Sequence, residues 1–269
     1  MLVDLHTHSA ASDGQYSPAE LVRLAKECGI EAVALTDHDT IQGLREAVRA
    51  GQSHSIRVIC GIELSAEEYP DLHILGHGVR MDSPMLNQLC AQMQAEREKH
   101  KYRIADYLKK QGILIDLSEV ESLAAGGVIG RPHFAQIMVR HGYVQNDREA
   151  FDRYLDTEDY RRIKMAKPPA RVCIQAIKAA GGEAALAHPY QLQLENSQME
   201  QLLKQLKSNG LTGLECYYPR HSQAQTAFYL DLAKRLELHV TAGSDFHGER
   251  VHPGDRLIPI ELDMEWLCT

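Results

Sequence analysis

The protein has 269 residues, enough for one large domain or for one domain with an insertion. Hydrophobic residues make up 44% of the chain and charged residues 25%, which is typical of a soluble globular protein and excludes a disordered or fibrous one. The net charge of -8 disfavours binding of long nucleic acid, which requires a basic stripe, but a metal cluster could still attract a short or mononucleotide substrate.

No targeting or membrane segment is expected. The N-terminus leads directly into charged, histidine-rich sequence without the apolar stretch of a signal peptide, and no run of 18 apolar residues is present. The cysteines are far apart and form no CxxC pair, which predicts reduced thiols in a cytoplasmic protein. We expect a monomer or a small homo-oligomer without a membrane partner. The cysteines are Cys28, Cys60, Cys90, Cys173, Cys216 and Cys268.

The first part of the chain alternates between strand and helix patterns. Asp4, His6 and His8 would share one face of an opening strand. Ser17 and Pro18 then mark the start of a helix, as an N-cap followed by proline at the first helical position. This order predicts parallel strands with helices outside them. The further elements expected are strands at 31–36, 56–63 and 72–76 and a helix at 41–50.

A segment from 83 to 168 interrupts this alternation. It is rich in Gln, Glu, Lys and Arg at helical spacing and has no clear strand pattern, so we interpret it as a helical insertion domain. Residues 1–82 and 169–269 would together form the α/β barrel domain. The elements expected after the insertion are strands at 183–187, 211–217 and 238–243 and helices near 171–180, 197–207 and 222–236.

Residues able to bind metal ions stand at the ends of the predicted strands. In parallel α/β barrels the carboxyl ends of the strands form the edge where active sites lie, and loop residues placed there are seldom selected for packing. Side chains from five separate strands are therefore expected to meet at this edge. They are His8, His38, Glu63, His188 and Asp245.

Two pairs of residues have a spacing that suits a single metal ion. His6 and His8 are two apart on a strand, so both imidazoles can reach one ion. Asp245 and His247 repeat this spacing after the last predicted strand. Asp13, in a Ser-Asp-Gly segment, is by itself typical of a turn, and its assignment as a ligand depends on the other residues.

For two further histidines, the assignment as metal ligands depends on the neighbouring sequence. His38 lies between Asp37 and Asp39, and one of these carboxylates could orient a metal-bound imidazole. His73 lies within an apolar strand, where a lone histidine is more often an ordinary core residue. Imidazoles and carboxylates without thiolates suit Mn, Fe or Zn. The candidates outnumber the ligands of one ion, which predicts a cluster of two or three ions. The nine candidates are His6, His8, Asp13, His38, Glu63, His73, His188, Asp245 and His247.

Six motifs, which together span nearly the whole chain, resemble those of the PHP (polymerase and histidinol phosphatase) superfamily. The narrower resemblance is to bacterial PHP phosphoesterases that act on nucleoside 3',5'-bisphosphates and on the 5' ends of short RNAs, and Gly-Arg-Pro-His-Phe-Ala at 130–135 carries it. The six motifs are Asp-Leu-His-Thr-His-Ser at 4–9, Ser-Asp-Gly at 12–14, Thr-Asp-His-Asp-Thr at 36–40, Gly-Ile-Glu at 61–63, Ala-His-Pro at 187–189 and Gly-Ser-Asp-Phe-His at 243–247.

The resemblance implies a distorted (β/α)7 barrel with three divalent metal ions, for which Mn is favoured and Fe or Zn are alternatives. It also implies phosphomonoester hydrolysis by a metal-activated hydroxide, with a small phosphorylated nucleotide as substrate and short RNA as a second candidate. The implied ligands are His6, His8, Glu63 and Asp245 for the first ion, Asp13, His38 and His247 for the second, and Glu63, His73 and His188 for the third.

Four histidine and arginine assignments depend on this resemblance. His77 lies close to His73 and is an alternative ligand, although His-Ile-Leu-Gly at 73–76 fits the family pattern better. Arg131 is expected to bind phosphate as a guanidinium fork and to offset its charge, with His133 beside it. His221 could contact phosphate or protonate the leaving oxygen. A solvated Arg131 and an uninvolved His221 at helix starts are the structural alternatives.

Three other functions share parts of this pattern. A phosphatase for another small monoester, such as histidinol phosphate, would have the same scaffold and metals. A metal-dependent amidohydrolase also uses histidines at a barrel edge, but it usually has a metal-bridging lysine, and no lysine stands at a predicted strand end. A non-catalytic metal-binding module would be expected to have lost ligands, whereas this sequence keeps all nine.

Overall fold

A computed structural model of the protein describes all residues except 125–126, 164, 250, 252–253 and 268–269. Cys268 lies outside the described residues, and the five other cysteines have free thiols. Within the described part of the chain, no helix is both long enough and apolar enough to span a membrane.

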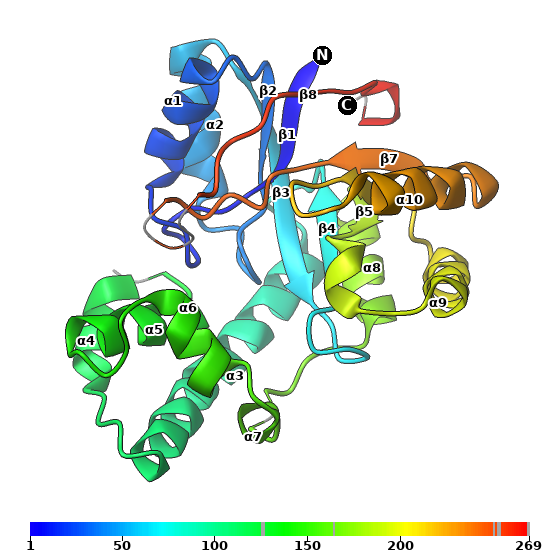
Figure 1. The fold of residues 1–269 in the computed structure, drawn as a ribbon. Coiled ribbons are helices and arrows are strands. Elements are labelled where there is room, and N and C mark those ends of the chain that lie inside the picture. Colours follow the sequence, from blue (N-terminus) through cyan, green and yellow to red (C-terminus); the bar gives the residue numbers. More distant parts are fainter. Residues whose placement is uncertain (125–126, 164, 250, 252–253, 268–269) are drawn as a thin grey trace.

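Eight strands form one curved sheet that is nearly closed into a barrel (Figure 1), which confirms the predicted α/β barrel class. The spatial order is β7-β6-β5-β4-β3-β2-β1-β8, and a parallel bridge between Thr7 and Phe246 brings the chain after β7 against the end of β1. The short β8 was not predicted. The strands are β1 (Leu2–Thr7), β2 (Ala32–Leu35), β3 (Arg57–Ser65), β4 (His73–His77), β5 (Glu183–Leu186), β6 (Gly213–Tyr217), β7 (His239–Ala242) and β8 (Ile260–Glu261).

The expectation of parallel strands was wrong for β4, which is antiparallel to both β3 and β5. The reason is the short connection, because residues 66–72 are too few for a crossover between parallel strands, which needs a dozen residues or more. Ser65 at the end of β3 pairs with His73 at the start of β4. The beginning of β4 therefore lies at the same edge of the barrel as the end of β3.

Helices cover the outside of the barrel, with α1 and α2 on one side and α8 to α10 on another (Figure 1). The predicted start of α1 is confirmed, because Ser17 and Glu20 form a capping box and Pro18 is the first helical residue. The hydrophobic core lies between these helices and the sheet. The helices are α1 (Pro18–Glu27), α2 (Leu44–His54), α8 (Ala170–Ala179), α9 (Asn196–Ser208) and α10 (Gln223–Arg235), with a short 3-10 helix η2 (Pro189–Leu192).

The segment between β4 and α8 is helical in its described residues. Its first helix, α3, contributes Met93 to the barrel core and Ile104 and Leu108 to a second hydrophobic core around Phe134. One helix thus joins the two cores. The helices of this segment are α3 (Pro84–Lys110), α4 (Leu117–Ala124), α5 (Arg131–Arg140), α6 (Asp147–Ala150), the π-helix η1 (Phe151–Leu155) and α7 (Glu158–Arg161).

The C-terminal segment packs at the strand ends opposite to the beginning of β4. The ring of Trp266, in the short 3-10 helix η3 (Glu265–Leu267), stacks on His239 and lies edge-on to His77. Leu262 and Leu267 join Val3 in a small apolar cluster. His77 therefore faces a packed region of the protein.

Because Phe134 is fully buried in the second hydrophobic core, we expect that shortening its side chain strongly destabilises the protein. Phe134→Ala should lower the free energy of unfolding by about 3–5 kcal/mol, because it removes buried surface and leaves a cavity. Leu114→Ala, at a side chain that is 64% exposed in the same segment, should change it by less than about 0.5 kcal/mol. Urea denaturation measures both. Equal effects of the two substitutions would contradict a separate core in this segment.

Candidate metal centre

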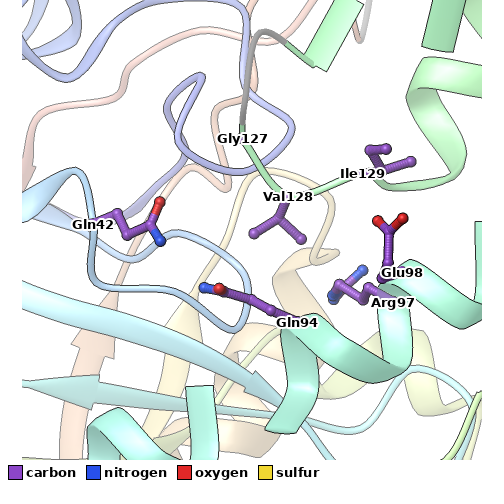
Figure 2. Close-up of a pocket in the computed structure, with 7 residues that line it drawn as sticks. All are labelled: Gln42, Gln94, Arg97, Glu98, Gly127, Val128 and Ile129. Carbon is purple, nitrogen blue, oxygen red and sulfur yellow. The ribbon is translucent and has the colours of Figure 1, made fainter. Parts of the chain in front are cut away.

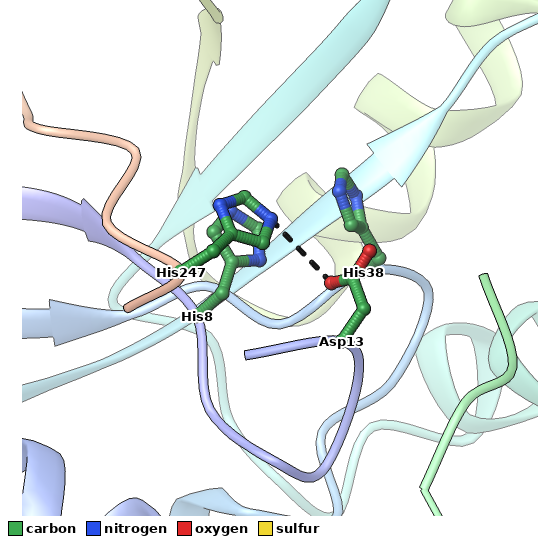
Figure 3. A group of neighbouring side chains, drawn as sticks. All are labelled: His8, Asp13, His38 and His247. Atoms are coloured by element: carbon green, nitrogen blue, oxygen red, sulfur yellow. Dashed lines mark ion pairs between the residues drawn. The ribbon is translucent and has the colours of Figure 1, made fainter. Parts of the chain in front are cut away.

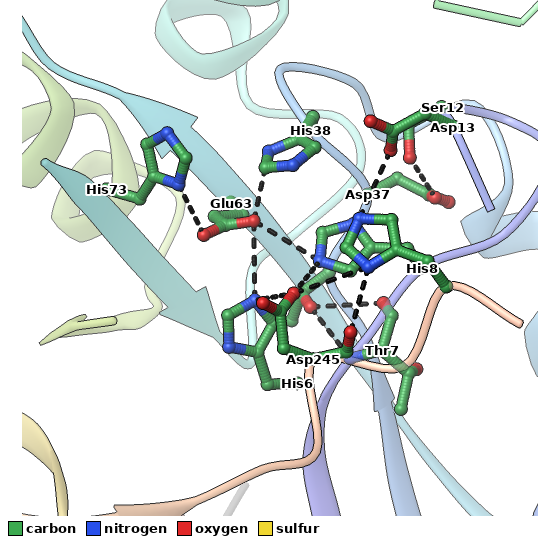
Figure 4. Close-up of polar contacts among 12 residues, drawn as sticks. His6, Thr7, His8, Ser12, Asp13, Asp37, His38, Glu63, His73 and Asp245 are labelled. Atoms are coloured by element: carbon green, nitrogen blue, oxygen red, sulfur yellow. Dashed lines mark hydrogen bonds and ion pairs between the residues drawn. The ribbon is translucent and has the colours of Figure 1, made fainter. Parts of the chain in front are cut away.

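The ends of the strands bring the predicted metal ligands together. Nitrogen and oxygen atoms of three overlapping groups lie within 4.8 Å of one another, a spacing that suits a shared ion in each group. Figure 3 shows the group around Asp13, and Figure 4 shows the larger cluster. The groups are His8, Asp13, His38 and His247; His6, His8, Glu63 and Asp245; and His38, Glu63 and His73.

Glu63 is the centre of this cluster. Its side chain is fully buried, and five imidazole nitrogens lie within 2.8–3.3 Å of its carboxylate oxygens (Figure 4 labels His6, His8, His38 and His73). The two oxygens contact different imidazoles, so each can face a different ion. His73 and His188 contact Oε1, and His6, His8 and His38 contact Oε2.

The unsatisfied polar atoms of the cluster indicate that metal ions fit it. Buried nitrogen and oxygen atoms in proteins nearly always have hydrogen-bond partners, because an unpaired one loses its hydration without compensation. Here several buried atoms of the candidate ligands have no hydrogen-bond partner among the described residues. They are His6 Nε2, both nitrogens of His8, Asp13 Oδ1, His38 Nδ1, Glu63 Oε2 and His188 Nδ1.

A carboxylate that the sequence did not reveal contacts the ring of one candidate histidine and the backbone of another. Oε1 of the buried Glu215, in β6, lies 3.0 Å from His6 Nδ1, and its Oε2 accepts a hydrogen bond from the backbone N–H of His188 at 2.6 Å. Metal-bound histidines commonly bond a carboxylate through their second nitrogen. The one available signal was a glutamate inside an otherwise apolar strand.

One of the two aspartates beside His38 was expected to orient an imidazole, but the hydrogen bonds of Asp37 and Asp39 go to other groups. Asp37 accepts hydrogen bonds from Ser9 and Ser12, and these fix the loop that carries Asp13. Asp39 accepts a hydrogen bond from the backbone N–H of Ser65 and pairs with Arg97 of α3. Both carboxylates therefore shape the loops around the cluster and do not orient a ligand side chain directly.

The backbone of the site is held in unusual conformations. Asp39, His188 and Asp245 have φ angles of 54°, 24° and 57°, in a region that L-residues seldom adopt. Such conformations persist where surrounding contacts enforce them, and they are concentrated at functional sites. Gly243 allows another close approach, because a Cβ atom there would lie 2.2 Å from His6 Cβ.

The structure separates His73 from His77. His73 Nδ1 lies 2.8 Å from Glu63 Oε1, at the edge where the other candidate ligands meet. His77, at the opposite end of β4, donates from Nε2 to the carbonyl oxygen of Leu5 at 2.9 Å. Because β4 is antiparallel, its first residue and not its last one reaches the cluster.

The three residues expected to bind substrate lie outside the cluster. Arg131 is half-buried, and its guanidinium lies 3.7 Å from Asp71 and 3.6 Å from Asp156. His133 accepts the N–H of Gly130 on its Nδ1. His221 Nδ1 lies 2.9 Å from the carbonyl oxygen of Cys216, and its Nε2 is buried without a hydrogen-bond partner.

Charges in the cluster shift the pKa values of its members in opposite directions. Burial opposes ionisation, but it is outweighed by the neighbouring imidazoles, which hold the pKa of Asp13, Glu63 and Asp245 well below its usual range. Burial by itself would lower the pKa of His247. The neighbouring carboxylates of Asp13 and Asp245 outweigh this effect and raise the pKa to about 10. In the absence of metal, protons therefore compensate part of the negative charge.

A family model and curated relatives match this chain. The PHP domain model matches residues 4–164. A 5'-3' exoribonuclease of Haemophilus influenzae is 35% identical, over 96% of this chain and 97% of the relative. A phosphoribosyl 1,2-cyclic phosphate 1,2-diphosphodiesterase of Eggerthella lenta is 32% identical (93% and 95%), and a 3',5'-nucleoside bisphosphate phosphatase of Chromobacterium violaceum is 29% identical (91% and 87%).

A solved structure agrees with these matches. A Chromobacterium violaceum protein, named an amidohydrolase with bound sulfate and no metal, superposes with a TM-score of 0.89 at 28% identity, covering 98% of this chain and 92% of that chain. The chain therefore belongs to the PHP family, as the sequence motifs predicted, and its class is that of the metal-dependent phosphoesterases.

The position of His73 predicts a difference between two matched substitutions. His73→Gln should lower the metal content of the purified protein, because it removes a candidate ligand that contacts Glu63. His77→Gln should leave the metal content unchanged and cost about 1 kcal/mol of stability through its hydrogen bond to Leu5. Inductively coupled plasma mass spectrometry measures the metals. Loss of metal in the His77 variant alone would reverse this assignment.

The raised pKa of His247 predicts that metal binding releases protons. With a pKa of about 10, this imidazole is protonated at pH 7.5 in the metal-free protein, and it must lose its proton to bind an ion. The apparent metal affinity should therefore rise with pH. Calorimetric titration of metal-free protein with Mn²⁺, in buffers of different ionisation enthalpy, measures the released protons. His247→Gln should release fewer, and a binding enthalpy independent of the buffer would contradict the prediction.

Proposed function

We propose that the protein hydrolyses phosphomonoesters of small nucleotides, converting a nucleoside 3',5'-bisphosphate to a nucleoside 5'-monophosphate and phosphate. The observation that carries the proposal is the buried cluster around Glu63, with unsatisfied atoms that suit several metal ions. The bisphosphate phosphatase among the relatives supports this substrate. The exoribonuclease relative favours the 5' ends of short RNAs as a second candidate.

The nine predicted ligands are proposed to hold a set of divalent ions, with Mn favoured over Fe or Zn. When bound, such ions supply a nucleophilic hydroxide at neutral pH and positive charge for the phosphoryl oxygens. In the reaction, an oxygen derived from water bonds to phosphorus, the ester P–O bond breaks, and the leaving oxygen gains a proton. The residues of the chain then have to position the phosphate and allow a proton to reach the leaving oxygen.

His133 and His221 are proposed to contact the substrate in different ways, the first as a hydrogen-bond donor and the second as an acceptor. His133 accepts the Gly130 N–H on Nδ1, so its neutral tautomer carries the proton on Nε2 and can donate to a phosphate oxygen. His221 bonds a carbonyl through Nδ1, so its neutral form has an acceptor at Nε2. Burial lowers the pKa of His221, which disfavours the protonated form that a general acid needs. We therefore propose that His221 accepts a hydrogen bond from the substrate.

Arg131 is proposed to bind a phosphate oxygen after exchanging its present partners. Its two carboxylate contacts are longer than 3.5 Å, its Nη1 donates to the carbonyl oxygen of Leu155 at 3.3 Å, and its side chain is 36% exposed. It also lies 5.5 Å from the centre of the Phe151 ring, which restricts its position. A charge-assisted fork to phosphate is a stronger interaction than these separate contacts.

A substrate screen tests the proposal. Metal-stripped protein reloaded with Mn²⁺ would be assayed on adenosine 3',5'-bisphosphate, AMP, histidinol phosphate, a 5'-phosphorylated oligoribonucleotide and a ribosyl 1,2-cyclic phosphate. We expect the highest kcat/KM for the bisphosphate and no activity before reloading. A preference for histidinol phosphate or for the cyclic diester would replace the proposed substrate. Full metal loading without activity on any of them would indicate a non-catalytic module.

The role of Arg131 can be measured separately. Arg131→Ala should lower kcat/KM for the bisphosphate. The loss should correspond to about 1.5–3 kcal/mol of transition-state stabilisation, the usual contribution of a hydrogen bond to a charged group. The metal content of this variant should stay the same, because Arg131 contacts none of the candidate ligands. Arg148→Ala, at an exposed arginine of the same helical segment, is the matched control. Equal kcat/KM values in the two variants would remove Arg131 from the substrate site.

A further inference from the structure

A cavity of about 190 Å³ lies where the helical segment meets the barrel. Gln94 and Arg97 of α3 form one side, residues 127–129 form another, and Gln42 closes it from the loop after β2. Figure 2 shows the side chains of Gln42, Gln94 and Val128 directed into the same space. None of these residues has been given a role in the proposed reaction.

The cavity adjoins the metal centre through two loops. The N–H of Val128 donates to the carbonyl oxygen of Ala11 at 3.1 Å, in the loop that carries Asp13. A Cβ atom on Gly127 would lie 2.3 Å from the Ala10 carbonyl oxygen, so the two backbones touch there. On the other side, Gln42 follows His38 by four residues. The loops that carry Asp13 and His38 therefore also border the cavity.

Arg97 uses only one edge of its guanidinium in the described structure. Its Nε and Nη2 donate to Oδ2 of the fully buried Asp39, and Nη2 also lies 3.4 Å from Ser65 Oγ. Its Nη1 makes no hydrogen bond or ion pair with any described residue. Because a guanidinium presents two edges of N–H donors, the second edge stays available to a ligand in the cavity.

The other polar groups of the cavity favour an anion. The carboxamides of Gln42 and Gln94 likewise have no hydrogen-bond partner among the described residues, and each can donate two N–H groups. Glu98, the one carboxylate among the described residues that line the cavity, forms an ion pair with Lys101, which offsets its charge. Arg97 is only 15% exposed, so its interaction with an anion would be weakly screened.

We propose that this cavity binds the second, non-reacting phosphate of the substrate through Arg97 Nη1 and the carboxamides of Gln42 and Gln94. This inference rests on the proposed function, in which the reacting phosphate lies at the metal centre. It assigns the preference for a bisphosphate over a monophosphate to residues separate from Arg131. The same guanidinium holds Asp39 through its other edge, so the second phosphate and the loop after β2 share one cation.

The test compares two substrates with the same reacting ester, adenosine 3',5'-bisphosphate and adenosine 3'-monophosphate. The ratio of their kcat/KM values, measured with Mn²⁺-loaded protein, isolates the second phosphate. In the Gln42→Ala/Gln94→Ala double variant this ratio should fall by more than tenfold, because two hydrogen bonds to a charged group are lost. Arg97→Lys keeps a charge for Asp39 but loses the second donor edge, and its ratio should fall by at least as much.

Gln92→Ala, at an exposed glutamine two residues from Gln94 on α3, is the matched control and should leave the ratio unchanged. Metal content would be measured for each variant, so that loss of ions is not mistaken for loss of the anion site. If the variants lower kcat/KM for both substrates by the same factor, or if the wild-type protein does not prefer the bisphosphate, the cavity is not the second phosphate site.

A binding measurement separates this inference from the proposed function. Calorimetric titration with adenosine 5'-monophosphate, which retains the second phosphate, should show an affinity more than tenfold weaker in the double variant than in the Gln92 control. If neither substrate is hydrolysed but this difference is found, the proposed function fails and the anion site stands. If the two affinities are equal, the site fails whether or not the bisphosphate is hydrolysed.

Discussion

The structure depends on placing one carboxylate, Glu63, in a fully buried position among five imidazoles. Burying this many ionisable groups is unfavourable unless their charges are compensated. Protons can do so in part, as the raised pKa of His247 shows, and divalent ions can do so more completely. The left-handed residues Asp39, His188 and Asp245 beside the cluster are consistent with the strain that such a site stores.

The helical segment is part of the site and not only an addition to the barrel. Through α3 it shares a core with the barrel, and Arg97 reaches from that helix to Asp39, next to His38. Ser65, at the end of β3, bonds the same carboxylate, so this contact also fixes the strand that carries Glu63. Rearrangement of α3 would therefore affect both the cavity and the metal cluster.

Much of the candidate site could be predicted because its candidate ligands occur in short motifs at strand ends. The seven main strands were expected, and so was the capping box of α1. The antiparallel direction of β4 could have been inferred from its seven-residue connection to β3. Glu215 and Arg97 could not be found in this way, because a single charged residue in a strand or a long helix has no local pattern that indicates its partner.

The sequence by itself determined the chemical character of the site, since imidazoles and carboxylates from several strand ends together suit divalent metal ions. Only the tertiary structure decided which end of β4 reaches the cluster, and hence the difference between His73 and His77. It also decided that Glu63 presents its two oxygens to different imidazoles, and that Arg97 faces both Asp39 and a cavity. The reason is physical: strand direction and side-chain orientation follow from pairing between segments far apart in the chain, which local patterns do not encode.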